Sequence, residues 1–246
     1  MIIKFMSFNI QHGFDFVRKD RIDLSLTADA IRKADADIIG LNEMRGEGPD
    51  ADYTDQTKAI ADMLGFHYYF AKAIEFNNKG PYGNAILSRY PIKQAETFII
   101  PDPVIKDEPA YYETRCILKA DFDVAAGFSV YVSHFGLAVS EKRNAVKTLI
   151  QLIDKQEKPY VFMGDLNMTP DNELLQPIYN RLIDTANVFN NTKLSFPSDQ
   201  PRVKIDYIFT SKDIRVISAD VPSIVVSDHR PHIAVLEIKE LYRSGC

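Results

Sequence analysis

Two short polar segments of this chain carry side chains that could bind a metal ion and move a proton. One is Gly164-Asp165-Leu166-Asn167, which follows the apolar run Tyr160–Met163. The other is Ser227-Asp228-His229, which comes shortly before the apolar run Ile233–Leu236. Polar groups at the end of a buried strand are held rigidly away from water, which suits metal binding and general-base chemistry. Either segment alone is also typical of an ordinary turn, because Asp, Gly, Ser and Pro are common where strands end.

The elements that would position these groups form two similar units, each made of a strand, an amphipathic helix and a second buried strand. In each unit the strands lead directly to polar side chains. Strand candidates outnumber helices along the chain, which favours two packed sheets covered by helices over one doubly wound sheet. The two units are predicted over 2–8, 22–34 and 37–41, and over 128–133, 140–156 and 160–163; further strands are predicted near 66–72, 83–88, 112–120, 203–209 and 232–238.

The polar residues at these strand ends make one set of candidate site residues. Two stretches rich in Pro and charge, 101–110 and 195–204, are predicted to be surface loops that could frame a site built from them. In chain order, the set is Asn9, Glu43, His134, Asp165, Asn167, Asp206, Asp228 and His229.

Composition places the chain among soluble globular proteins. Of its 246 residues, 46% are hydrophobic and 26% are charged. No apolar run approaches the roughly 20 residues that a membrane-spanning helix needs. The segment Met1–Phe8 lacks the basic, apolar and small-residue order of a signal peptide. Only Cys116 and Cys246 are present, so no disulfide framework is expected. We therefore expect a cytoplasmic protein without stable membrane insertion.

The charge balance argues against extensive contact with polyanions. The chain has 29 Lys and Arg against 34 Asp and Glu, and its net charge is −5. A protein that grips duplex nucleic acid needs a basic surface, and no basic insertion is evident. The charge therefore disfavours nucleic acid as a partner, although a local basic patch is compatible with the total.

Seven short segments resemble, in order, the motifs of the endonuclease/exonuclease/phosphatase superfamily, which has the DNase-I-like fold. Any one of them is weak, but together they follow the family's order from residue 7 to residue 229. The sequence departs from the family at Asn42, where Gln is more frequent, while Glu43 is kept. The matching segments are Ser7–Ile10, Ile39–Glu43, Gly83–Ile92, Ser133–Leu137, Gly164–Asn167, Lys204–Phe209 and Ser227–His229.

This resemblance implies a small bacterial-type member of the superfamily, with residues 1–246 forming a single domain. The implied fold class is α/β, arranged as a four-layer α/β/β/α sandwich with the site at one edge of the two sheets. Such a fold is consistent with the repeated strand–helix–strand plan.

The resemblance also implies phosphoester hydrolysis with a Mg²⁺ cofactor, Mn²⁺ being the alternative. This reaction needs a nucleophile, neutralisation of charge on the phosphoryl oxygens and help for the leaving oxygen. Mg²⁺ typically takes one or two carboxylates and keeps several waters. Glu43 is the expected principal ligand, with Asn9 and Asp228 as supporting ligands. The competing interpretations are a helix cap for Glu43 and a turn residue for Asn9.

Proton transfer and phosphate binding are expected to fall to the remaining residues of the set. His229 is the expected general acid or base, because imidazole titrates near neutrality. By resemblance, Asp206 accepts a hydrogen bond from its other ring nitrogen. Asp165 and Asn167 would orient the attacking water and bind the phosphoryl group, and His134 would donate to a phosphate oxygen.

Simpler structural roles compete with these assignments. His134 could be an ordinary core histidine, and Asp206 could be a surface residue before a strand. Arg115 could bind substrate phosphate or pair with a carboxylate, and the sequence favours neither. His12 is expected to be a packing residue, and Cys116 is expected to be buried and inert.

The favoured function is metal-dependent hydrolysis of a phosphodiester or phosphomonoester bond in a small substrate. Family resemblance does not choose the substrate, because function lies in loops grafted on the fold. A DNA- or RNA-directed nuclease is the alternative, and a non-catalytic binding module is less favoured because such modules typically lose site residues. A membrane-lipid enzyme would need an exposed apolar segment, for which Phe98–Pro101 is the candidate. No obligate protein partner is evident.

Overall fold

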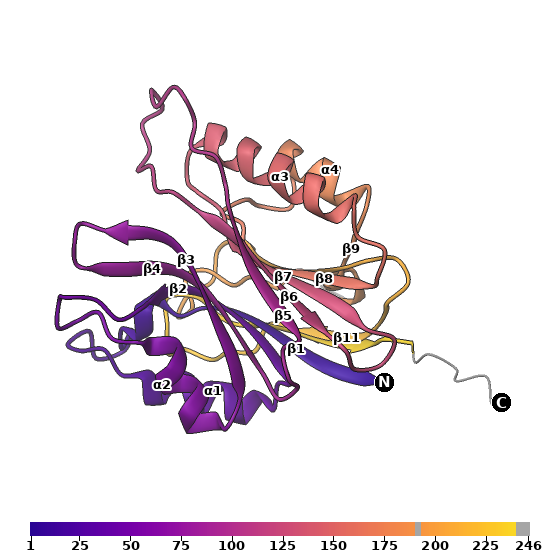
Figure 1. Ribbon diagram of the computed structural model, residues 1–246, viewed down its shortest axis with the longest axis horizontal. Coiled ribbons are helices and arrows are strands. Elements are labelled where there is room, and N and C mark those ends of the chain that lie inside the picture. Colours follow the sequence, from indigo (N-terminus) through magenta and orange to yellow (C-terminus); the bar gives the residue numbers. More distant parts are fainter. Residues whose placement is uncertain (190–192, 240–246) are drawn as a thin grey trace.

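Two six-stranded sheets pack face to face in the computed structural model, which describes residues 1–189 and 193–239 (Figure 1). Helices α1 and α2 cover the outer face of one sheet, and α3 with the short α4 covers the outer face of the other (Figure 1). The predicted α/β/β/α layering is therefore confirmed. The helices are α1 (Leu24–Ala34), α2 (Gln56–Leu64), α3 (Val139–Ile153) and α4 (Gln176–Tyr179), with 3-10 turns at Gln11–Gly13, Glu173–Leu175 and Thr185–Val188.

Each sheet has a parallel pair of strands at its centre and antiparallel pairs around it. The order in the first sheet is β11 (Arg215–Asp220), β12 (His232–Glu237), β1 (Ile2–Asn9), β2 (Ile38–Arg45), β4 (Gly80–Ser88) and β3 (His67–Phe76). The order in the second sheet is β5 (Gln94–Ile99), β6 (Cys116–Phe122), β7 (Phe128–His134), β8 (Tyr160–Asp165), β10 (Asp206–Thr210) and β9 (Ile183–Asp184).

The two parallel pairs close the two predicted strand–helix–strand units, β1–α1–β2 and β7–α3–β8. Because parallel strands end at the same edge of a sheet, polar residues that follow them lie side by side. Asn9 is paired with Asn42 at the end of the first unit, and His134 with Asp165 at the end of the second. Asp206, the first residue of β10, is paired with Asp165 from the other side.

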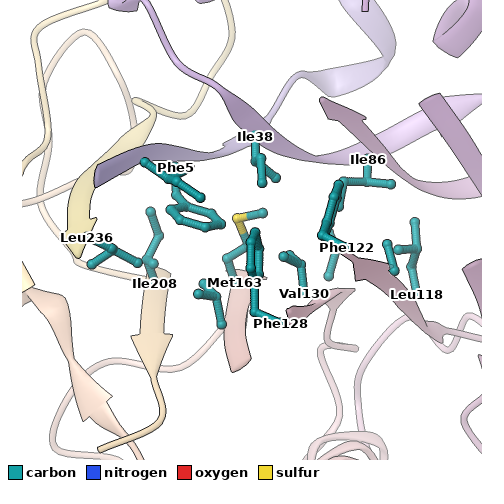
Figure 2. Close-up of a cluster of buried hydrophobic side chains, with 14 of the residues drawn as sticks. Phe5, Ile38, Ile86, Leu118, Phe122, Phe128, Val130, Met163, Ile208 and Leu236 are labelled. Atoms are coloured by element: carbon teal, nitrogen blue, oxygen red, sulfur yellow. The ribbon is translucent and has the colours of Figure 1, made fainter. Parts of the chain in front are cut away.

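Apolar side chains from both sheets fill the space between them. Figure 2 shows Phe5, Ile38 and Leu236 of the first sheet facing Met163 and Phe128 of the second, and all five are fully buried. Separate apolar clusters lie beneath α1 and α2 and beneath α3 and α4. Burial of one such side chain contributes about 1.5–3 kcal/mol to the stability of the fold. The strand ends are therefore anchored by a tightly packed core.

Local sequence sets where the first two helices begin and end. The Asp23 side chain caps α1 by accepting a hydrogen bond from the Ser25 N–H, and Asp55 caps α2 in the same way. Gly65 ends α2 with a left-handed φ of 70°, a conformation that favours glycine. In the described part of the chain, no helix is long and apolar enough to cross a membrane.

The helices and strands that were not predicted are the short elements α4 and β9, helix α2, and the two edge strands β5 and β11. No position of either edge strand is fully buried, so the alternation that signals a strand is weak there. Two predicted strands also begin later than expected. The strand predicted at 112–120 starts at Cys116, and the one predicted near 203–209 starts at Asp206, because the preceding residues are in loops.

Candidate active site

All nine predicted site residues lie together at the edge where the central strands of both sheets end. Asn9 and Glu43 come from the first sheet, and His134 and Asp165 come from the second. The remaining residues lie at strand beginnings or in the adjoining loops: Arg115, Asn167, Asp206, Asp228 and His229. Direct contacts connect nearly all of them.

The Asp165 carboxylate is at the centre of the site, with the residue only 1% exposed. Its Oδ2 accepts a hydrogen bond from Asn9 Nδ2 at 3.1 Å, and its Oδ1 accepts one from the Asn167 N–H at 2.9 Å. The same Oδ2 lies 3.5 Å from Nε2 of His134 and 3.5 Å from Nε2 of His229. Burial raises the pKa of Asp165 to about 7, although the charge of His229 opposes this shift.

His229 and Asp206 form a hydrogen-bonded pair beside Asp165. Nδ1 of His229 is 2.9 Å from Oδ2 of Asp206, and an ionised carboxylate can only accept, so the proton lies on Nδ1. Burial opposes the charged imidazole, but the Asp206 and Asp165 carboxylates outweigh it and raise the pKa of His229 to about 10. The Phe196 ring packs against the imidazole with centroids 4.8 Å apart. The 195–204 loop therefore covers one face of this pair.

His134 lies on the other side of Asp165 in a different environment. Its Nδ1 is 2.9 Å from Nη1 of Arg115, and its Nε2 is 3.2 Å from Nδ2 of Asn167. Burial, Arg115 and His229 together hold the pKa of His134 well below its usual range, so the ring is neutral. The two imidazoles at Asp165 thus differ in charge.

Glu43 and Asp228 form the acidic side of the site. Glu43 lies where the β2–β4 register shifts between Leu41 and Met44, and it has a left-handed φ of 62°. This irregularity turns its carboxylate toward Asn9, whose Nδ2 donates to Oε1 at 3.0 Å. Burial and the nearby Glu43 carboxylate raise the pKa of Asp228, with His229 acting in the opposite direction.

This acidic side fits a hard divalent cation. Its donor atoms are oxygens, and a bound cation would offset the repulsion by which the Glu43 charge raises the pKa of Asp228. In the present arrangement Asn9 turns its amide nitrogen toward Glu43 and Asp165, while its oxygen accepts from the Gln11 N–H at 3.1 Å. Asn9 therefore supports the carboxylates by donation, and direct ligation through its oxygen would require the amide to rotate.

Asp165, Asp206 and His229 form a second arrangement that could hold a metal, with ligand atoms within 4.8 Å of one another. Two of these ligand groups already bond each other, because His229 donates to Asp206. A metal at this position would compete with the pair, and an imidazole ligand suits transition metals better than Mg²⁺. Glu43 with Asp228 stays the expected Mg²⁺ position.

Several residues at the site were not assigned from the sequence. The buried Asn42 amide accepts from the Asp165 N–H at 3.0 Å and donates to Asn84 at 2.8 Å, so it fixes the Asp165 backbone. Burial and the Glu43 carboxylate raise the pKa of the Tyr82 hydroxyl. Glu113 forms an ion pair with Arg115 at 3.0 Å. Its position two residues before Arg115 was the one available signal.

The two residues that were expected to have structural roles, Cys116 and His12, differ in where they lie. Cys116 is buried, and burial raises the pKa of its thiol to about 12, which agrees with an inert role. His12 lies near the site in a left-handed turn with a φ of 46°. Burial and Arg45 lower the pKa of His12 to about 4, and Glu43 opposes this shift. Cys246 lies outside the described residues.

Comparisons with known proteins find the same family and the same fold. A model of the Endonuclease/Exonuclease/phosphatase family matches residues 6–229. The fold is similar to an endonuclease/exonuclease/phosphatase from Bacteroides vulgatus, with a TM-score of 0.76, 20% identity, and coverage of 97% of this chain and 100% of that chain. It is also similar to a mannosyl-6-phosphatase from Bacteroides thetaiotaomicron VPI-5482, with a TM-score of 0.77, 18% identity, and coverage of 96% and 100%. Protein cwh43 of Schizosaccharomyces pombe is 27% identical over 138 residues, which are 55% of this chain and 13% of that protein.

Proposed function

We propose that this chain, which belongs to the endonuclease/exonuclease/phosphatase family, hydrolyses a phosphoester bond in a small substrate with the help of a divalent cation. One observation carries the proposal. The carboxylate of the buried Asp165 lies 3.5 Å from two imidazoles, of which His229 is charged and His134 is neutral. The Asn9 amide donates hydrogen bonds both to this carboxylate and to Glu43 on the acidic side. This arrangement offers a proton acceptor, a proton donor and a neutral hydrogen-bond donor around one reaction centre.

The side chains around Asp165 divide the proton transfers between them. A carboxyl group whose pKa is about 7 can take a proton from an attacking water near neutral pH, which suits Asp165. The protonated His229, held by Asp206, can give its Nε2 proton to the leaving oxygen as the phosphorus–oxygen bond breaks. His134 and Asn167 would donate hydrogen bonds to the phosphoryl oxygens, where negative charge builds up.

Glu43 and Asp228 would hold Mg²⁺, or Mn²⁺ in its place, with Asn9 supporting their carboxylates. When bound, the ion supplies positive charge against the phosphoryl oxygens.

The charge of the molecule supports a small substrate. With 29 basic and 34 acidic residues, the chain has no net positive charge to attract a long nucleic-acid backbone. The similar fold of a mannosyl-6-phosphatase makes sugar phosphates reasonable first candidates for the assay. A DNA- or RNA-directed nuclease is the alternative, because the same groups could cleave a phosphodiester within a polymer.

A panel of phosphomonoesters, small phosphodiesters and plasmid DNA, assayed with Mg²⁺ and with Mn²⁺, tests the proposal. We expect turnover of at least one small ester, loss of that turnover in excess chelator, and little turnover of plasmid. The matched control is His229→Ala, which should remove turnover caused by the site and leave any contaminating phosphatase. Efficient nicking of plasmid without hydrolysis of small esters would favour the nuclease, and no hydrolysis of any phosphoester would contradict the proposal.

A further inference from the structure

We infer that Arg115 is a positioning residue, which sets the tautomer of His134 rather than holding substrate phosphate, and that Glu113 keeps Arg115 in place. This inference rests on the proposed function, because it concerns the same site. It adds a role for Glu113, and it chooses between the two roles that the sequence leaves open for Arg115.

The contact between Arg115 and His134 has one chemical interpretation. Nη1 of Arg115 is 2.9 Å from Nδ1 of His134, and a guanidinium has donors but no acceptor. Nδ1 must therefore accept the hydrogen bond with its lone pair. A neutral imidazole carries one proton, so the proton of His134 lies on Nε2.

This tautomer makes His134 a donor toward the reaction centre. Its Nε2–H lies 3.5 Å from Oδ2 of Asp165, which is an acceptor. The 3.2 Å contact between Nε2 and Asn167 Nδ2 is then not a hydrogen bond, since both atoms would donate; the Asn167 amide donates instead to the Phe135 carbonyl oxygen at 2.9 Å. The Nε2–H stays available for an oxygen of the phosphoryl group. With the opposite tautomer, a lone pair would face both the Asp165 carboxylate and the phosphoryl oxygens.

Glu113 holds the guanidinium in the position that this contact requires. Its Oε1 is 3.0 Å from Nη1 of Arg115, and the two side chains are 8% and 12% exposed. The backbone of Glu113 is fixed in turn, because its N–H donates to Oε1 of Glu141 at 2.9 Å. Oε2 of Glu141 accepts from the Ala138 N–H at 3.0 Å at the start of α3. Nη1 of Arg115 thus forms an ion pair with Glu113 and a hydrogen bond with His134, in a largely buried position.

Nitrogen NMR of histidine-labelled, metal-free protein tests the inference, because the pattern of proton–nitrogen correlations distinguishes the two neutral tautomers. The His134 signal is identified by its absence in His134→Gln. We expect the Nε2–H tautomer in the parent protein and in Arg115→Lys, which keeps a donor. We expect a mixture or the opposite tautomer in Arg115→Met, which removes the donor, and a partial shift in Glu113→Gln.

Steady-state kinetics on the same variants separate positioning from substrate binding. We expect Arg115→Met to lower kcat by about 10- to 100-fold with little change in KM, and Arg115→Lys to recover part of this loss. A raised KM with unchanged kcat and an unchanged tautomer would show that Arg115 binds substrate instead. The Nδ1–H tautomer in the parent protein would overturn the inference even if none of the Arg115 and Glu113 variants folded. Because the spectra need no substrate, they stay decisive if the proposed function fails.

Discussion

The Asp165 carboxyl group lies in an environment that disfavours its own ionisation, and this has a consequence for stability. Its folded pKa is about 7, above the ordinary value of 3.8, because the side chain is buried. Ionisation therefore stabilises the unfolded chain more than the folded chain. The penalty is absent below the unfolded pKa, grows as pH rises from about 4 to about 7, and is constant above that range.

Replacement of Asp165 by Asn should therefore stabilise the metal-free protein while removing its activity. The gain in the free energy of unfolding should be larger at about pH 8 than at about pH 5, because only the parent protein carries the ionisation penalty. Chemical denaturation in chelator at the two pH values measures the difference. A variant that is less stable than the parent at both pH values would show that the Asp165 charge is well compensated in the folded state.

His229 and Asp206 share one proton through their 2.9 Å hydrogen bond, so they should act as a unit. His229→Ala should lower kcat at least about 10²-fold, the lower range for general acid–base catalysis. Asp206→Asn should also impair turnover, because an amide can favour the wrong tautomer. The loss in the double variant should be close to that of His229→Ala alone. If the two losses multiply instead, the residues serve separate steps.

At the scale of secondary structure, Gly164 allows β7 and β8 to bring His134 next to Asp165. Gly164 has a φ of +149°, and a Cβ atom there would overlap the carbonyl oxygen of Ser133 on the paired strand. With any larger residue at this position, the two strands could pair only if the backbone that carries Asp165 shifted.

Gly164→Ala should destabilise the fold by at least about 2 kcal/mol, because the added Cβ strains the pairing of β7 with β8. It should also reduce activity, because these two strands position His134 and Asp165. Gly65→Ala is the matched control. Gly65 also has a left-handed φ, of +70°, but a Cβ atom there would meet no atom within 4 Å. Its cost should be about 1 kcal/mol without loss of activity beyond the unfolded fraction. Thermal unfolding and kcat measure both variants, and equal effects of the two substitutions would contradict this role of Gly164.

The elements that could be predicted from the sequence are those with a strong and regular burial pattern. The buried central strands and the helices α1 and α3 have such patterns, so the two repeated units and the two-sheet architecture were predictable. The edge strands β5 and β11 are half-exposed, and each pairs with one strand only, β6 and β12 respectively. Their strand character is a product of tertiary contact rather than of local pattern.

The site residues were predictable for a related reason, since they lie at the ends or beginnings of buried strands or in the loops beside them. Their contacts were not. The orientation of the Asn9 amide depends on Glu43, and the position of the Arg115 guanidinium depends on His134. In both cases the partner comes from a distant segment of the chain. The position of Glu113 two residues before Arg115 was a weak signal, because one acidic residue in a charged loop has many structural explanations. Residue types thus indicate the chemistry, while the fold decides which atom faces which.

At the scale of the whole molecule, the excess of acidic residues bears on the substrate. Each phosphate contact to duplex DNA adds to the salt dependence of binding, because counterions are released. A chain with net charge −5 should make few such contacts. Hydrolysis of a small phosphoester should therefore change less than about tenfold between about 50 and about 200 mM salt. Plasmid nicking with steep salt inhibition would instead indicate that the protein surface binds many phosphates of the DNA backbone.

The requirement for Glu43 and a divalent cation is the central claim, and one titration tests it most directly. Hydrolysis of the best small ester is measured against Mg²⁺ concentration for the parent protein, for Glu43→Gln, and for Glu47→Gln as a control at an exposed position of the same segment. We expect saturable activation by Mg²⁺ in the parent and in Glu47→Gln, and a loss of at least about 10²-fold in Glu43→Gln with an unchanged circular dichroism spectrum. Full activity in excess chelator, or equal activity of the two variants, would contradict the account.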